Sequence, residues 1–174
     1  MASGEAKIHA LTSARLTFRP LAMEDLEDYV RLYADPEVTR WLEGERPRTP
    51  GESTARLARD VAHWSTHGFG RWAVREKLTG AFVGRAGFSR MVNGDVELGY
   101  VLSPKFWGTG CASEAAARVL AYGLETWGFP RVIATVRPEN AASRRVLEKL
   151  GMKPVGEGDY FGARHLVYEV LQAG

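Results

Sequence analysis

The chain has 174 residues, of which 45% are hydrophobic and 25% are charged, a composition typical of one globular domain with a sizeable core. The formal net charge of +2, without a basic block, argues against nucleic acid as a partner. One cysteine excludes an internal disulfide, and no apolar run predicts a signal peptide or a membrane span. We therefore expect a soluble, cytoplasmic protein.

The N-terminal part of the sequence predicts a tail, a strand and a helix. Residues 1–14 are expected to form a flexible tail, so that the domain spans residues 15–174. Arg15–Arg19 alternates as a strand that Pro20 ends. The helix that follows stops before Asp35-Pro36, because a residue before proline disfavours helical backbone.

A second helix has clear signals at both ends. Thr49-Pro50-Gly51-Glu52 combines a capping Thr, a Pro at the first helical position and a Glu three residues after the cap. Gly68, after His67, predicts a left-handed C-terminal cap.

The middle of the chain predicts three strands and the longest amphipathic pattern. The strands are Gly70–Arg75, Ala81–Met91 and Val96–Leu102, and Asn93-Gly94 joins the last two as a hairpin. Apolar residues then recur with the period of a helix at Ala112, Ala115, Ala116, Val119, Leu120, Leu124 and Trp127.

The C-terminal part continues the alternation of strand and helix. Val132–Val136 is a β-branched strand, and Asn140–Leu150 is a helix that Gly151 ends. Two further strands complete the chain, which contains no repeat or linker. The fold class is therefore α/β, in a single domain.

The turn between the third strand and the long helix contains Gly108-Thr109-Gly110. Two glycines let a ligand approach backbone N–H groups, and the N-terminus of the next helix suits a phosphate or pyrophosphate. An isolated Gly-x-Gly is more often a simple tight turn, so the remaining motifs decide between the two interpretations.

Several segments, taken in order, resemble the Gcn5-related N-acetyltransferase (GNAT) superfamily, and most closely its ribosomal-protein N-acetyltransferase-like branch. The matching segments are Leu16–Pro20, Asp35–Val38, Glu97–Tyr100, Phe106–Ala115, Asn140–Ser143 and Leu147–Met152. The resemblance implies a mixed, mostly antiparallel sheet with splayed central strands, flanked by helices. It also implies acetyl-coenzyme A as co-substrate and an amine acceptor, with a homodimer as a possible assembly.

The resemblance also implies which residues bind the coenzyme. The pyrophosphate is expected on the turn Gly108–Ala112 and the pantetheine arm along the strand at Tyr100–Leu102. Lys105 occupies the position where the family usually has Gln or Arg. Its ammonium group carries a positive charge but lacks the planar, bidentate donors of a guanidinium group. The expected coenzyme-binding residues are Tyr100, Val101, Leu102, Lys105, Phe106, Trp107, Gly108, Thr109, Gly110, Cys111, Ala112, Asn140 and Arg145.

The resemblance makes Glu97 the expected catalytic base, acting through a water, whereas the residues by themselves favour an ordinary carboxylate. It alternates with Val96 and Leu98, so its side chain points away from theirs, and Gly99 leaves room for a ligand on the same face. A solvated carboxylate on the sheet is the alternative interpretation.

Asn140 and Ser143 are expected near the departing thiolate. Asn140 is placed to cap its helix and to bind the coenzyme arm or a water. The tyrosine acid common in the superfamily is replaced here by Leu147, so Ser143 becomes the candidate hydrogen-bond donor to sulfur. A first-turn serine without function is the alternative.

Other reactive side chains receive structural interpretations. Cys111 is expected to pack, because no histidine is placed to activate it, and Glu114 to suit the helix dipole. His63 and His67 lack a third ligand, so no metal is expected. Glu43 and Glu45, with Trp41 and Trp64, lie where the branch forms its acceptor site, although packing or solvation would explain them equally.

The leading function is therefore acetyl-coenzyme A-dependent transfer of acetyl to a primary amine, either a protein N-terminus or a small molecule. The alternative is a non-catalytic module that binds acyl-coenzyme A. A dinucleotide dehydrogenase is disfavoured, because Ser113 occupies the third glycine position and hairpins precede the turn.

Overall fold

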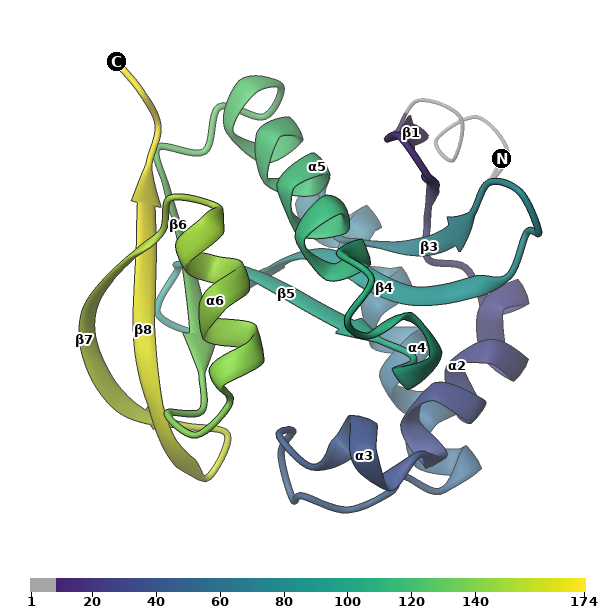
Figure 1. The fold of residues 1–174 in the computed structure, drawn as a ribbon. Coiled ribbons are helices and arrows are strands. Elements are labelled where there is room, and N and C mark those ends of the chain that lie inside the picture. The colour runs from purple at the N-terminus through teal and green to yellow at the C-terminus, as the bar shows by residue number, and fades with distance from the viewer. Residues whose placement is uncertain (1–8) are drawn as a thin grey trace.

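The computed structural model describes residues 9–174 as one sheet with helices on both faces (Figure 1). The elements are β1 (Leu11–Thr12), β2 (Leu16–Pro20), the 3-10 helix η1 (Met23–Asp25), α2 (Leu26–Ala34), α3 (Pro36–Thr39), α4 (Pro50–His67), β3 (Arg71–Glu76), β4 (Phe82–Arg90), β5 (Val96–Leu102), the 3-10 helix η2 (Pro104–Phe106), α5 (Cys111–Glu125), β6 (Arg131–Val136), α6 (Ala141–Lys149), β7 (Lys153–Tyr160) and β8 (Ala163–Leu171).

The sheet has eight strands in the order β1-β2-β3-β4-β5-β6-β8-β7. Every neighbouring pair is antiparallel except β5 and β6, which run parallel and share a single pairing, Glu97 with Ile133. Beyond that pairing the two central strands diverge (Figure 1). The expected mixed sheet with splayed central strands is therefore confirmed.

Two hydrophobic cores cover the two faces of the sheet. The larger core joins α5 to the sheet through Ala115, Val119 and Leu120, which lie on the stripe seen in the sequence. The smaller core joins α2 and α4 to the opposite face, around Tyr29 and Leu57. The sheet is thus sandwiched between α5 and α6 on one side and α2 and α4 on the other (Figure 1).

The helix ends follow the local signals closely. Thr49 Oγ1 accepts a hydrogen bond from the N–H of Glu52, while the Glu52 side chain accepts from the N–H of Thr49, as a capping box requires. Gly68 closes α4 in the left-handed conformation. Both predicted signals of this helix are confirmed.

The short helix α3 differs from the sequence prediction. Asp35-Pro36 was expected only to end the preceding helix, but Asp35 also caps a new turn by accepting from the N–H of Glu37. Proline is favoured at the first position of a helix, so the same dipeptide ends α2 and begins α3.

The expected N-terminal tail is only partly within the described residues. Residues 1–8 lie outside them, whereas β1 pairs with β2. The Glu114 carboxylate accepts hydrogen bonds from the Ser13 hydroxyl and from the Arg15 backbone and guanidinium. These bonds fasten the start of the domain to α5, which confirms a structural role for Glu114.

Candidate active site

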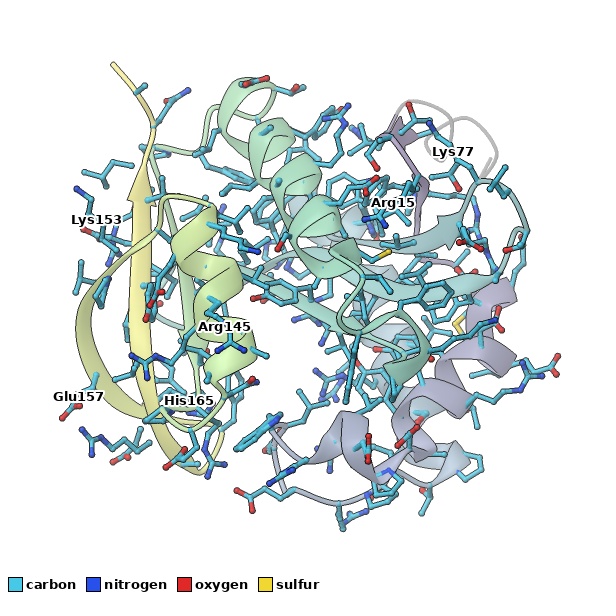
Figure 2. All side chains as sticks on the ribbon, viewed as in Figure 1. Arg15, Lys77, Arg145, Lys153, Glu157 and His165 are labelled. Carbon is cyan, nitrogen blue, oxygen red and sulfur yellow. The ribbon has the colours of Figure 1, made fainter. Side chains whose placement is uncertain are left out.

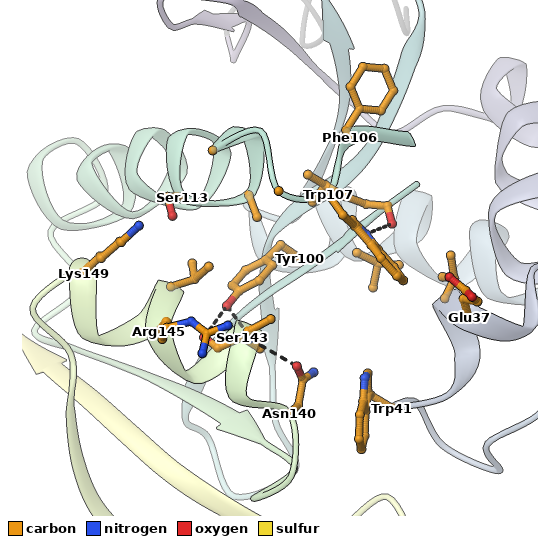
Figure 3. Close-up of a pocket in the computed structure, with 18 of the residues that line it drawn as sticks. Glu37, Trp41, Tyr100, Phe106, Trp107, Ser113, Asn140, Ser143, Arg145 and Lys149 are labelled. Atoms are coloured by element: carbon orange, nitrogen blue, oxygen red, sulfur yellow. Dashed lines mark hydrogen bonds between the residues drawn. The ribbon is translucent and has the colours of Figure 1, made fainter. Parts of the chain in front are cut away.

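A large cavity of about 420 Å³ opens beside the N-terminus of α5 (Figure 3). Its lining comes mainly from β5, the turn before α5, the first turns of α5 and α6, and the α3 region. The expected coenzyme-binding residues on this lining are Tyr100, Val101, Leu102, Phe106, Trp107, Gly108, Gly110, Ala112, Asn140 and Arg145.

The glycine turn leaves its backbone accessible to this cavity. Gly108 and Gly110 have φ values of +70° and +82°, in the left-handed region that favours glycine. No heavy atom lies within 4 Å of the position that a Cβ on Gly108 would take. No side chain caps the N-terminus of α5. The turn can therefore present unpaired N–H groups and a positive helix end to an anion.

Cationic side chains lie on the opposite wall of the large cavity. Arg145 and Lys149 on α6 both line it (Figure 3). Three other residues predicted to bind coenzyme are not on the lining: Lys105 Nζ lies 5.6 Å from the Phe106 ring centroid, the Thr109 hydroxyl donates to the Phe106 carbonyl, and Cys111 is buried in the core. The structure thus places the positive charge on α6.

A hydrogen-bonded group joins β5 to the start of α6. The Tyr100 hydroxyl lies 2.9 Å from Ser143 Oγ, and Asn140 Oδ1 accepts from the Ser143 N–H at 3.2 Å (Figure 3). The cap that the sequence predicts for Asn140 is confirmed. Burial raises the pKa of Tyr100 to about 12, so its phenol remains protonated near neutral pH.

Glu97 lines a second, smaller cavity of about 160 Å³. The carboxylate is only 8% exposed and accepts a hydrogen bond of 2.6 Å from the Thr135 hydroxyl on β6. The solvated alternative is therefore excluded, because Glu97 is buried at the point where β5 and β6 separate.

The two cavities meet at the divergence of the central strands. Both are lined by Tyr100 and Ser143, together with Trp41, Leu42 and Val101. A group bound along β5 in the large cavity can therefore meet a group bound beside Glu97 in the small one. This arrangement brings the three expected catalytic residues, Glu97, Asn140 and Ser143, around one junction.

The residues suspected of forming an acceptor site separate into two sets. Trp41 and Glu43 line the small cavity, whereas Glu45 pairs with Arg137. Trp64 lies in the core of aromatic rings, with its indole N–H donating to the Arg71 carbonyl. Packing therefore explains Trp64.

The histidine pair of α4 carries no metal-binding geometry. The His63 ring bonds the Phe69 carbonyl through Nδ1 and accepts from the Arg90 N–H at Nε2, so both nitrogens are occupied by backbone. Burial lowers its pKa below the usual value. Within residues 9–174, no group of three or more His, Cys, Asp or Glu side chains could hold a metal.

The sequence reasoning missed several residues of the small cavity. Arg56, Arg71 and Arg85 come from α4, β3 and β4, and all three line it. The only sequence signal was Arg85 itself, a charged residue within the strand Phe82–Arg90, whose other central residues are apolar or small. An arginine in such a strand needs a buried partner or a function.

Comparisons with known proteins agree with this geometry. Residues 15–153 match the acetyltransferase (GNAT) domain family. The chain is 31% identical over 152 residues to the uncharacterized N-acetyltransferase p20 of Bacillus licheniformis, covering 86% of this chain and 85% of that protein. The chain belongs to the GNAT family, and it is an acetyltransferase.

Solved structures share the whole fold. The crystal structure of an acetyltransferase from Agrobacterium tumefaciens superposes with a TM-score of 0.83 at 29% identity, covering 94% of each chain. The ribosomal-protein-S5-alanine acetyltransferase of Vibrio fischeri gives 0.76 at 17% identity, covering 94% of this chain and 96% of that chain. The structural neighbours thus include the ribosomal-protein branch, although that second likeness concerns the fold alone.

None of the helices within residues 9–174 is long and apolar enough to cross a membrane.

Proposed function

We propose that this acetyltransferase transfers acetyl from acetyl-coenzyme A to a primary amine by direct attack in a ternary complex. The observation that supports the proposal most strongly is the junction of the two cavities, which share Tyr100 and Ser143 at the divergence of β5 and β6. The donor is assigned to the large cavity and the amine to the small one.

The residues of the large cavity fit the coenzyme. The open space over Gly108 and the uncapped N-terminus of α5 suit a pyrophosphate, and Arg145 and Lys149 add positive charge on the facing wall. The diverging strand β5 has backbone groups near Tyr100–Leu102 that β6 does not pair. Acetyl-coenzyme A, when bound there, supplies the acetyl thioester.

Glu97 is assigned the role of general base. An aliphatic amine is mostly protonated near pH 7 and must lose a proton to become a nucleophile. The Glu97 carboxylate accepts that proton through a bound water, while the Thr135 hydroxyl holds it in one orientation. Backbone N–H groups of β5 hold the thioester oxygen.

The leaving thiolate is assigned to the group at the start of α6. Asn140 fixes the first turn of the helix, and the Ser143 hydroxyl hydrogen-bonds the sulfur. The Tyr100 phenol lies within hydrogen-bond distance of Ser143, so it can pass a proton toward the thiolate. Burial keeps this phenol protonated near neutral pH, so it is available as a hydrogen-bond donor that stabilises the thiolate through Ser143.

The test is incubation with isotopically labelled acetyl-coenzyme A and a panel of peptides, polyamines, aminoglycosides and amino acids, read by mass spectrometry. Labelled N-acetyl product that is absent with Glu97→Gln would support the proposal. Coenzyme binding by calorimetry without transfer to any acceptor would contradict it and favour a binding module.

A further inference from the structure

The small cavity contains an unusual concentration of buried arginines. Arg56, Arg71 and Arg85 line it together with Glu97. Arg85 is only 3% exposed, and the Arg71 side chain is 14% exposed. Arg85 on β4 lies directly opposite Val101 on β5, so the two side chains point to the same face of the sheet. Every second residue of a strand points to one face, so Glu97 shares that face with Val101 and Arg85.

The positive charge of this cluster exceeds the negative charge around it. Asp60 pairs with Arg71 at 2.6 Å and also accepts from the Tyr29 hydroxyl. Across residues 9–174, no carboxylate lies within ion-pair distance of Arg56 or Arg85. The three guanidinium groups carry three positive charges, and the carboxylates of Asp60 and Glu97 balance two of them. Glu43 at the rim is exposed to solvent and is not counted, so one positive charge remains.

Several guanidinium nitrogens also lack hydrogen-bond acceptors. Arg85 Nε donates to the Tyr33 hydroxyl at 2.7 Å, but its buried Nη1 has no partner, and neither do Arg56 Nε and Arg71 Nε. Arg85 Nη1 lies 3.4 Å from the position of a Cβ on Gly99. Buried donors are satisfied in nearly all native proteins, so three unpaired donors in residues that line one cavity indicate a missing acceptor.

The ionisation of Tyr33 reflects the same excess charge. Burial by itself would raise the pKa of this phenol, but the guanidinium groups of Arg85 and Arg56 lower it below its usual value. An anion beside these arginines would supply the missing negative charge.

We infer that the acceptor is a small amine that also carries a carboxylate, as a free amino acid does, with its carboxylate bound by Arg85 and Arg56. This inference rests on the proposed function. Guanidinium groups bind carboxylates through paired hydrogen bonds, and one carboxylate neutralises the remaining charge. With the carboxylate at Arg85, the amine is directed toward Glu97 on the same sheet face. A peptide N-terminus lacks this carboxylate, because its carbonyl is part of an amide.

The test compares amino acids with their carboxamides as acceptors, at saturating acetyl-coenzyme A. We expect kcat/KM to favour the carboxylate by about tenfold or more, although the carboxamide amine is the less basic of the two. Arg85→Gln should bring the ratio close to one through KM, and Arg56→Gln should lower it partly. Arg90→Gln, on the exposed end of the same strand, serves as the control and should keep the wild-type ratio.

A second measurement does not depend on catalysis. Calorimetry with coenzyme A present compares an N-acetyl amino acid with its carboxamide, in the wild type and in Arg85→Gln. Binding of the carboxylate that requires Arg85, without any acetyl transfer, would contradict the proposed function and support the carboxylate site. Transfer without a carboxylate preference, or equally fast transfer to peptides, would overturn the inference and leave the proposed function intact. Absence of both would overturn both.

Discussion

The two cavities of this acetyltransferase are built in different ways. The large cavity depends on backbone: a glycine turn, a helix N-terminus and a strand edge, drawn largely from two short stretches of the chain. The small cavity depends on residues that seven elements bring together, from α4 to β8. His165 on β8 is one of them (Figure 2). Many different sequences can supply the backbone groups that bind one donor, whereas the side chains of the small cavity select the acceptor.

The largest expected effect comes from placing a side chain in the open space over the glycine turn of the large cavity. Gly108→Val places a β-branched side chain at positive φ and in the open space over the turn, so coenzyme affinity should fall on the order of a hundredfold or more. Calorimetry with coenzyme A measures the change. Gly80→Val, at a similar φ of +71° in the β3–β4 turn, is the matched control for backbone strain. Equal affinity in both variants would contradict the placement of the coenzyme.

The second prediction separates chemistry from binding. Glu97→Gln should lower kcat about a hundredfold or more by removing the general base, while coenzyme affinity stays at the wild-type value. Glu76→Gln, on β3 and outside the small cavity, should leave the rate unchanged. A kcat of Glu97→Gln close to the wild-type value would exclude Glu97 as the base.

The third prediction concerns the stability of the side-chain site. Among residues 9–174, Asp60 is the only carboxylate paired with Arg71, so Asp60→Asn should lower the free energy of unfolding by roughly 3 to 5 kcal/mol. Denaturant unfolding at about pH 7 measures it. Glu157→Gln, which breaks an exposed pair with Arg164, should change stability little.

The same group predicts how stability depends on pH. Burial by itself would raise the pKa of Asp60, but Arg71 and Arg85 lower it below the value of an unfolded Asp. Its stabilisation is therefore present above the unfolded pKa of about 3.9 and is lost as the pH falls through the lower folded pKa. In Asp60→Asn this part of the acid-induced loss should be absent. An acid unfolding curve that coincides with the wild type would contradict the assignment.

The smallest expected effect distinguishes the two hydroxyl groups at the junction. Ser143→Ala and Tyr100→Phe should each lower kcat about tenfold by weakening the hydrogen bonds to the thiolate. Because the pKa of Tyr100 is about 12, neither variant should move a limb of the rate profile between about pH 6 and 9. A loss confined to Ser143→Ala would show that the phenol is not part of the proton path.

Local signals predicted most of the elements, and ten of the thirteen residues expected to bind the coenzyme line one cavity. The caps of α4, the hairpin at Asn93-Gly94 and the strand Val96–Leu102 depend on interactions between near neighbours, which the sequence contains directly. Short helix α3 was missed, because Asp35-Pro36 favours both an end and a beginning. Trp64 was linked to the acceptor region by its place in the chain, but it lies in the aromatic core.

The sequence by itself determined most of the elements and the glycine turn, because each depends on residues close together along the chain, and the family resemblance added Glu97 as the candidate base. Tertiary structure alone decided which charges lie together. Arg56, Arg71 and Arg85 are separated in the sequence and meet only because α4 packs on β3, which pairs with β4. Charge balance in a buried cavity depends on such distant neighbours, and no local pattern encodes it.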